Sequence, residues 1–363
     1  MAKCKLGTEP VDWVIQKKDV EEVYKTLLAE TESSGEFKFY PNGASKMSAK
    51  AIGTDDIVKG ESDSVMTPMG IATYHTHPYD CYTQEQVIWG WPSGEDISQV
   101  LMWALSGNLI HVVFAVEGPY VLEVNPCCVV FMKGLSNRLR GAFIHWIMRI
   151  GQSTHDLRSH DVNQGLVDSG QHISPRDWIQ FVNGLAINNN NATCGLISCN
   201  DVAEFGRKKL VYTKIETYLK KFDKTVEFYP ITQSGEYAGP PVKMKPDAFA
   251  KEVAQIRQKK HNFVCGNKRS GSQDKKWGTG RIFNCRLEAT GTLKRYLARM
   301  KKLRKAPEKK ALMKTYYDNL AKKEHVEPPA LLRVARFPAM SGGCKENSVV
   351  KYRESTYEFK ASK

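Results

Sequence analysis

The most hydrophobic stretch of this chain, residues 109–132, constrains the fold most strongly, because charged residues and a proline divide it into short segments. The interruptions are Glu117, Glu123 and Pro126. A membrane-spanning helix needs roughly 18 or more consecutive apolar residues, so this stretch predicts buried strands and no membrane segment. Residues 109–116 and 120–124 flank Glu-Gly-Pro, which is the pattern of two strands joined in a hairpin.

Four segments before this hairpin follow helical or strand periodicity. In chain order, we predict a helix at residues 18–31, strands at 36–39 and 70–78, and a helix at 95–105. This order indicates an α/β fold with a mixed β-sheet flanked by helices. Beyond about residue 150 the pattern is mainly helical. Two apolar helical faces within residues 292–323 predict a basic helical hairpin.

Charge is segregated along the chain, whose net charge is +14. Residues 201–363 contain 38 Lys and Arg against 17 Asp and Glu, a balance of +21, whereas residues 1–200 carry 15 basic and 22 acidic residues. The basic half is expected to bind an acidic protein partner or nucleic acid, or to present solvated helix faces. Aromatic rings that could stack on bases accompany its basic runs; they are Tyr296, Tyr316 and Tyr317.

The cysteines and the N-terminus predict an intracellular location, in the cytoplasm or nucleus. Nine cysteines are scattered without a Cys-x-x-Cys pair, which favours free thiols in a reducing compartment and offers no zinc knuckle. The first ten residues are charged and lack an apolar stretch, so no secretory signal is expected.

The tetrapeptide His75-Thr-His-Pro78 points to metal chemistry. Side chains alternate between the two faces of a strand, so His75 and His77 should point the same way and could share a metal ion. A zinc site with an open position needs a third protein ligand. Asp96, at the start of the predicted helix that follows Ser93, is placed to supply it.

These residues resemble the motif of the JAMM (MPN-type) zinc metalloproteases, whose order is Glu-x-x-Gly, His-(Ser/Thr)-His-Pro and Ser-x-x-Asp. The matching segments are Glu32-Ser-Ser-Gly35, His75-Thr-His-Pro78 and Ser93-Gly-Glu-Asp96. The resemblance covers about residues 15–150. It implies that His75, His77 and Asp96 bind Zn²⁺, that Glu32 acts as general base and acid, and that Ser93 helps to stabilise the oxyanion. The reaction it implies is hydrolysis of an amide or isopeptide bond without a covalent intermediate.

One feature departs from the family: residues 78–92 separate the histidines from Ser93, and the family usually has about half as many residues here. The additional segment is aromatic, and we expect a flap over the site, which would either shape a substrate groove or close the site. This long form is similar to JAMM-like domains encoded by large DNA viruses of eukaryotes.

Several candidate residues also have other interpretations. Ser93 and Asp96 fit a helix-capping box, which is compatible with a ligand role. Glu32 could instead be an exposed residue at a helix C-terminus, with Glu30 and Glu36 as replacements. A nucleophilic Cys81 is disfavoured, because it would leave one histidine unused. A second metal at His155 and His160 is a weaker hypothesis.

The sequence thus predicts a JAMM-like domain at residues 1–155, a mainly helical region at 156–265, and a basic linker with helices at 266–363. The first functional hypothesis is a zinc-dependent peptidase or isopeptidase that acts on ubiquitin-like conjugates or peptides. The alternative is a non-catalytic component of a large assembly such as a virus particle, with the JAMM fold as scaffold and the basic half for docking.

Overall fold

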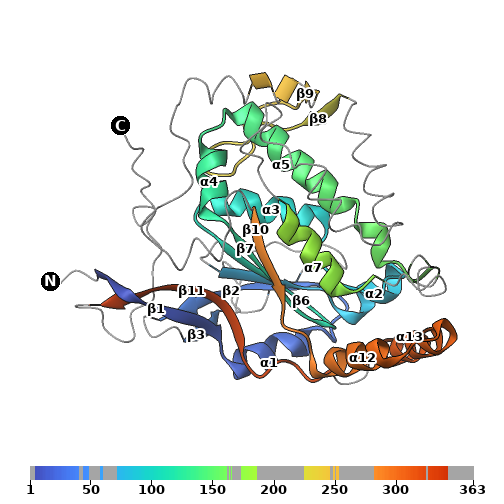
Figure 1. Ribbon diagram of the computed structural model, residues 1–363. Helices are drawn as coiled ribbons and strands as arrows, with labels where there is room; N and C mark the ends of the chain where they lie inside the picture. The colour runs from blue at the N-terminus through green and yellow to red at the C-terminus, as the bar shows by residue number, and fades with distance from the viewer. Residues whose placement is uncertain are drawn as a thin grey trace.

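A mixed β-sheet forms the centre of the molecule in the computed structural model (Figure 1). The structure describes residues 5–40, 44–48, 58–59, 72–161, 163, 165, 173–185, 225–245, 248–249, 251–252, 282–323 and 326–341. Within them, seven strands join in the order β10-β7-β6-β5-β2-β3, with β4 paired to β2. The strands are β2 (Ser33–Phe39), β3 (Ser45–Ser48), β4 (Val58–Lys59), β5 (Ala72–Thr76), β6 (Ile110–Ala115), β7 (Gly118–Val124) and β10 (Phe283–Leu287). The β5–β6 pair is parallel and the other pairs are antiparallel, which confirms the predicted mixed sheet.

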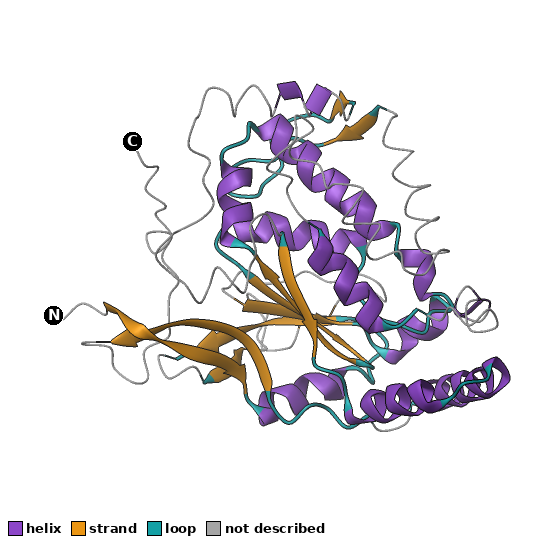
Figure 2. Cartoon of the chain, in the orientation of Figure 1, coloured by secondary structure: helices purple, strands orange, loops and turns teal. Residues whose placement is uncertain are grey.

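The described helices cover both faces of this sheet (Figure 2). They are α1 (Lys17–Thr26), α2 (Tyr79–Gln84), α3 (Gly94–Leu105), α4 (Pro126–Lys133), α5 (Asn137–Gln152), η1 (His155–Arg158), α7 (Pro175–Gly184), α12 (Gly291–Lys302) and α13 (Ala306–Ala321). Helix α3 packs against β6 and β7, and α7 packs against β10. None of the helices in the described part of the chain combines the length and apolar character needed to cross a bilayer.

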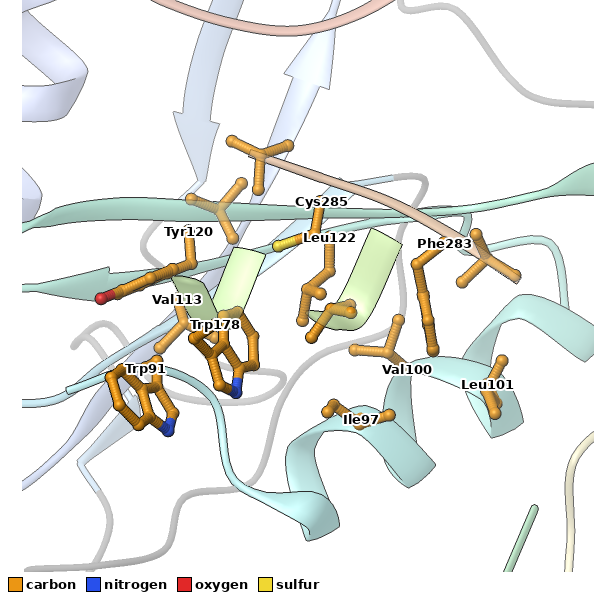
Figure 3. Packing of buried hydrophobic residues seen from close by; sticks show 14 of the residues in the cluster. Trp91, Ile97, Val100, Leu101, Val113, Tyr120, Leu122, Trp178, Phe283 and Cys285 are labelled. Atoms are coloured by element: carbon orange, nitrogen blue, oxygen red, sulfur yellow. The ribbon is translucent and has the colours of Figure 1, made fainter. Parts of the chain in front are cut away.

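Alternation along β5 assigns its side chains to two different layers. Tyr74 packs against the rings of Phe37 and Phe114, at centroid distances of 4.9 and 5.7 Å, and Phe114 in turn meets Tyr24 of α1. Figure 3 shows the opposite layer, where side chains of β6, β7, β10, α3 and α7 interdigitate. Its members include Ile97, Val100, Val113, Leu122 and Trp178, all of them buried. Residues that alternate with Tyr74 therefore face α3.

The predicted β-hairpin at 109–124 is confirmed as β6 and β7, all of whose residues are buried. The interpretation of the whole stretch to residue 132 as strands is wrong, because Pro126–Lys133 forms α4. A proline is well tolerated in the first turn of a helix, where its missing N–H has no helical partner.

The first helix is shorter than predicted: α1 ends at Thr26, and β2 already begins at Ser33. The amides of Leu27 and Leu28 bond to carbonyls only three residues back, which tightens the last turn. The carbonyl of Leu27 accepts a hydrogen bond from the amide of Tyr79 (3.0 Å). Glu32 is therefore the residue just before a central strand.

The C-terminal part of the chain contributes both helices and strands. The predicted helical hairpin is confirmed as α12 and α13, whereas β10 and β11 (Leu332–Ser341) were not predicted. Strand β10 pairs with β7, and β11 pairs with β1 (Lys5–Ile15). A small sheet joins β8 (Val226–Phe228) to β9 (Val242–Met244). The predicted division at residues 155 and 265 stays a prediction, and the predicted basic linker at residues 268–280 lies outside the described residues.

Candidate metal centre

Two imidazoles meet at the end of β5, on the layer that faces α3. The Nε2 atoms of His75 and His77 lie 3.0 Å apart, with ring centroids separated by 4.9 Å. Both residues are buried, with exposed fractions of 4% and 8%. The prediction that they leave the strand on the same side is confirmed.

Asp96 reaches the histidines from the first turn of α3. Ser93 caps this helix: its amide donates to Oδ2 of Asp96 (2.7 Å), and its hydroxyl accepts from the amide of Asp96 (3.1 Å). Oδ1 of Asp96 lies 3.4 Å from Nε2 of His75, and Oδ2 lies 3.8 Å from Nε2 of His77. The capping box and the approach to the histidines therefore coexist.

Close packing fixes the start of α3. A Cβ atom added at Gly94 would lie 2.2 Å from the carbonyl oxygen of Met148 and 2.4 Å from the amide nitrogen of Gln152. Both contacts are backbone atoms of α5, so they cannot move aside as a flexible side chain would. Gly94 thus allows the close approach that holds Asp96 at its place.

Glu32 enters the same cluster from the start of β2. Its Oε1 lies 3.7 Å from Nε2 of His77, and one ligand atom from each of Glu32, His75 and His77 lies within 4.8 Å of the others. Glu32 is buried, so its interpretation as an exposed helix terminus is wrong. Glu30 is exposed and Glu36 pairs with Lys38 at 3.1 Å, so Glu32 is the candidate that the fold places at the histidines.

The environment favours protonation states that bind a metal ion. Burial lowers the pKa of His75 and His77, that of His77 to about 3. For Asp96, burial acts to raise the pKa, but His75, His77 and the amide of Ser93 lower it to about 2. Both imidazoles are neutral near pH 7. They lower the pKa of Asp96 only at acidic pH, where they become protonated. Neutral imidazoles beside an ionised carboxylate are the ligand forms that metal binding requires.

His111 contacts the His75 ring at Nδ1, the nitrogen that does not face His77. Its Nε2 lies 2.7 Å from Nδ1 of His75, and its Nδ1 lies 2.9 Å from Oγ1 of Thr73, which also accepts from Nδ2 of Asn108 (2.8 Å). His111 is 1% exposed, and burial is the main cause that lowers its pKa. Sequence spacing did not identify this residue.

His77 is oriented by residues 78–92. Its Nδ1 lies 2.8 Å from the carbonyl oxygen of Gly90, which accepts the ring proton and leaves Nε2 facing the cluster. The amide of Gly90 donates to Oε1 of Glu117 (2.7 Å). Glu117 also accepts from the hydroxyls of Tyr82 and Tyr120, at 2.5 Å each, and burial raises its pKa. Glu117 therefore anchors the backbone that orients His77.

Residues 87–92 are buried in the molecule and 83–86 are exposed, so the expectation of an aromatic flap is wrong, and whether the segment shapes a groove or closes the site stays a prediction. Trp89 and Trp91 are 0% and 1% exposed. The indole N–H of Trp89 donates to the carbonyl of Ile173 (3.0 Å), and the amide of Ile88 donates to the carbonyl of Arg158 (2.8 Å). This segment therefore packs beside the site and orients His77 through the carbonyl of Gly90.

The remaining candidates lie in other surroundings. Cys81 is a buried cysteine on α2. The ring of His155 lies 2.7 Å from Nη2 of Arg158, and Nδ1 of His160 lies 3.3 Å from Oδ1 of Asp161. Within the described residues, no metal-binding group forms around His155 and His160. The second metal site is not supported there.

Comparisons with known proteins add one partial match. A segment of 66 residues is 38% identical to Uncharacterized protein 3R of Frog virus 3 (isolate Goorha), covering 18% of this chain and 14% of the length of that relative. No family model matches the chain, and no solved structure matches it. The comparisons assign it to no family.

Proposed function

We propose that the chain is a zinc-dependent hydrolase of amide or isopeptide bonds, with the metal held by His75, His77 and Asp96. The observation that carries the proposal is the buried group of His75, His77 and Glu32, which the half-buried Asp96 approaches from α3. The JAMM resemblance supports it through the same residues.

The donor set and its spacing fit zinc. Nitrogen or oxygen ligands at about 2.0–2.1 Å from a tetrahedral zinc ion stand roughly 3.3–3.4 Å apart. The two Nε2 atoms are 3.0 Å apart, and Oδ1 of Asp96 is 3.4 Å from Nε2 of His75. His111 and Gly90 can each accept an Nδ1 proton, which would leave the Nε2 lone pair of each histidine available to a metal ion.

Glu32 is the proposed general base and acid. When bound, zinc lowers the pKa of water to about 7 and polarises a carbonyl group. The buried carboxylate of Glu32 lies beside the histidines, where it can take a proton from water and return it to the leaving amine. The Ser93 hydroxyl accepts from the amide of Asp96, and its own O–H can donate to the oxyanion.

A Glu32→Gln variant tests this role. It should keep its zinc, because Glu32 is not a proposed ligand, yet cleave a panel of ubiquitin conjugates and peptides at least about 10²-fold more slowly. Glu36→Gln is the matched control, since Glu36 lies on the strand that Glu32 precedes and pairs with Lys38. Unchanged turnover in Glu32→Gln would remove the general base from the proposal. The ubiquitin-like substrate rests on the resemblance alone.

A second candidate function is a non-catalytic role in a large assembly such as a virus particle. The partial match to a Frog virus 3 protein favours it. The contacts of the centre can also be satisfied without a metal, if His75 carries its proton on Nε2 and donates it to His77. Zinc-loaded wild-type protein that cleaves nothing in the panel would support this candidate.

A further inference from the structure

The hairpin of α12 and α13 packs its apolar face against the rest of the protein. Along this face the residues are buried; they are Leu293, Tyr296, Met300, Leu312, Met313 and Tyr316. The rings of Tyr296 and Tyr316 lie 4.7 Å apart, and the Tyr316 ring lies 5.5 Å from that of Trp89. Helix α13 also contacts α2. The hairpin is thus docked on residues 78–92, and Figure 1 shows it extending outward at the lower right.

The outer surface of the hairpin is strongly cationic. Residues 291–323 contain twelve Lys and Arg against two Asp and Glu. Three of these cations have acidic partners: Lys294 with Glu288, Arg295 with Glu327, and Lys323 with Asp80. Among the described residues, eight others have no carboxylate within 4.0 Å; they are Arg299, Lys301, Lys302, Arg304, Lys305, Lys309, Lys314 and Lys322. All but Lys309 are exposed.

The aromatic side chains of the hairpin do not offer a stacking surface. Tyr296 and Tyr316 are 6% and 7% exposed, and the ring of Tyr317 lies 4.7 Å from that of His160. The expectation that these three rings could stack on bases is therefore wrong for Tyr296 and Tyr316. The surface offers cations to a ligand, but few groups that could read a base.

We propose that the α12–α13 hairpin binds the phosphate backbone of duplex nucleic acid without regard to base sequence. A helix rises 1.5 Å per residue, so the 16 residues of α13 span about 24 Å. A duplex presents one phosphate per roughly 1.7 Å of its axis, or about 14 charges over that length. A polyphosphate therefore matches a surface on which cations far outnumber carboxylates, whereas acidic protein surfaces seldom sustain such a charge density. This binding does not depend on the function proposed for the metal centre.

Titration of the full chain against a labelled DNA duplex of arbitrary sequence tests the proposal. Fluorescence anisotropy should show binding at low salt, and the logarithm of affinity should fall linearly with the logarithm of salt concentration. The slope is about −0.9 for each phosphate contact. A second duplex of unrelated sequence should bind equally well.

Matched variants locate the surface. Lys302→Gln, Lys305→Gln and Lys314→Gln together should weaken binding about tenfold or more and reduce the salt slope by about 0.9 per lost contact. The control carries Lys243→Gln, Lys245→Gln and Lys251→Gln, three exposed lysines on or near β9, which Figure 1 places at the opposite end of the molecule. Thermal unfolding checks that both variants fold.

Two outcomes would overturn the proposal. One is a hairpin variant that binds the duplex as tightly, and with the same salt slope, as the control. The other is a wild type that binds a poly-glutamate peptide but not the duplex, which would identify an acidic protein surface as the partner instead.

Discussion

At the scale of single residues, the orientation of His75 in the candidate metal centre depends on its contact with His111. His75 and His77 follow from the alternation of a strand, and Asp96 follows from the start of a helix. His111 could not be found in this way, because its contact with His75 depends on the parallel register in which Thr73 pairs with His111. A sequence without coordinates does not show register between strands that lie 36 residues apart.

A pair of substitutions at His111 tests whether it orients His75. His111→Leu removes the acceptor for Nδ1–H of His75, and a buried donor without a partner costs about 1–3 kcal/mol. We expect this variant to bind zinc roughly 10–100-fold more weakly. His111→Gln keeps an acceptor and should restore most of the affinity, as measured by competition with a chelator. Equal affinities for the wild type and His111→Leu would show that His111 does not support the ligand.

At the scale of helices and strands, each segment that a local pattern predicted has a counterpart in the structure, but its ends were not predictable. The helix at 18–31, the hairpin at 109–124 and the helical hairpin at 292–323 all have counterparts in the structure. The end of α1 depends on a hydrogen bond from Tyr79 to Leu27, and α4 depends on the position of Pro126 in a first turn. Glu32 was one of three candidates until the end of α1 was known.

Residues 78–92 show why composition alone misled. Aromatic residues in an additional segment are compatible with a flap over the site or with a layer buried in the core. The sequence alone does not show whether these side chains are exposed or buried. The deciding contacts are tertiary: Trp89 bonds to Ile173, and Gly90 lies between His77 and Glu117. These partners are distant in the chain, so no local pattern reveals them.

At the scale of the whole molecule, the cost of burying the histidines should appear as acid sensitivity of the metal-stripped protein. His77 has a pKa of about 3 in the folded state, against an ordinary 6.5. Below pH 6.5 the His77 imidazole binds a proton in the unfolded chain but not in the folded chain. The free energy of unfolding therefore falls as pH falls toward 3. Asp96 adds to the loss below its ordinary 3.8, as pH approaches about 2.

The free energy of unfolding in urea at pH 7 and pH 4.5 measures this effect. The metal-stripped wild type should lose about 2.5 kcal/mol more than His77→Asn over that interval, because the two pH units between 6.5 and 4.5 are each worth about 1.4 kcal/mol for one proton. His160→Asn, at an exposed ring, should behave as the wild type does. A His77→Asn variant as acid-sensitive as the wild type would contradict the assignment.

The acidic and the basic half of the chain share one sheet, since β10 of the basic half pairs with β7 of the sheet that carries the histidines. The central claim remains the proposal that His75, His77 and Asp96 hold one metal ion, with Glu32 beside it. The metal content of the purified full-length protein tests it most directly. We predict about one zinc ion per chain in the wild type and none in His77→Ala. A wild type that takes up no zinc on reconstitution, or a His77→Ala variant that keeps it, would contradict the account.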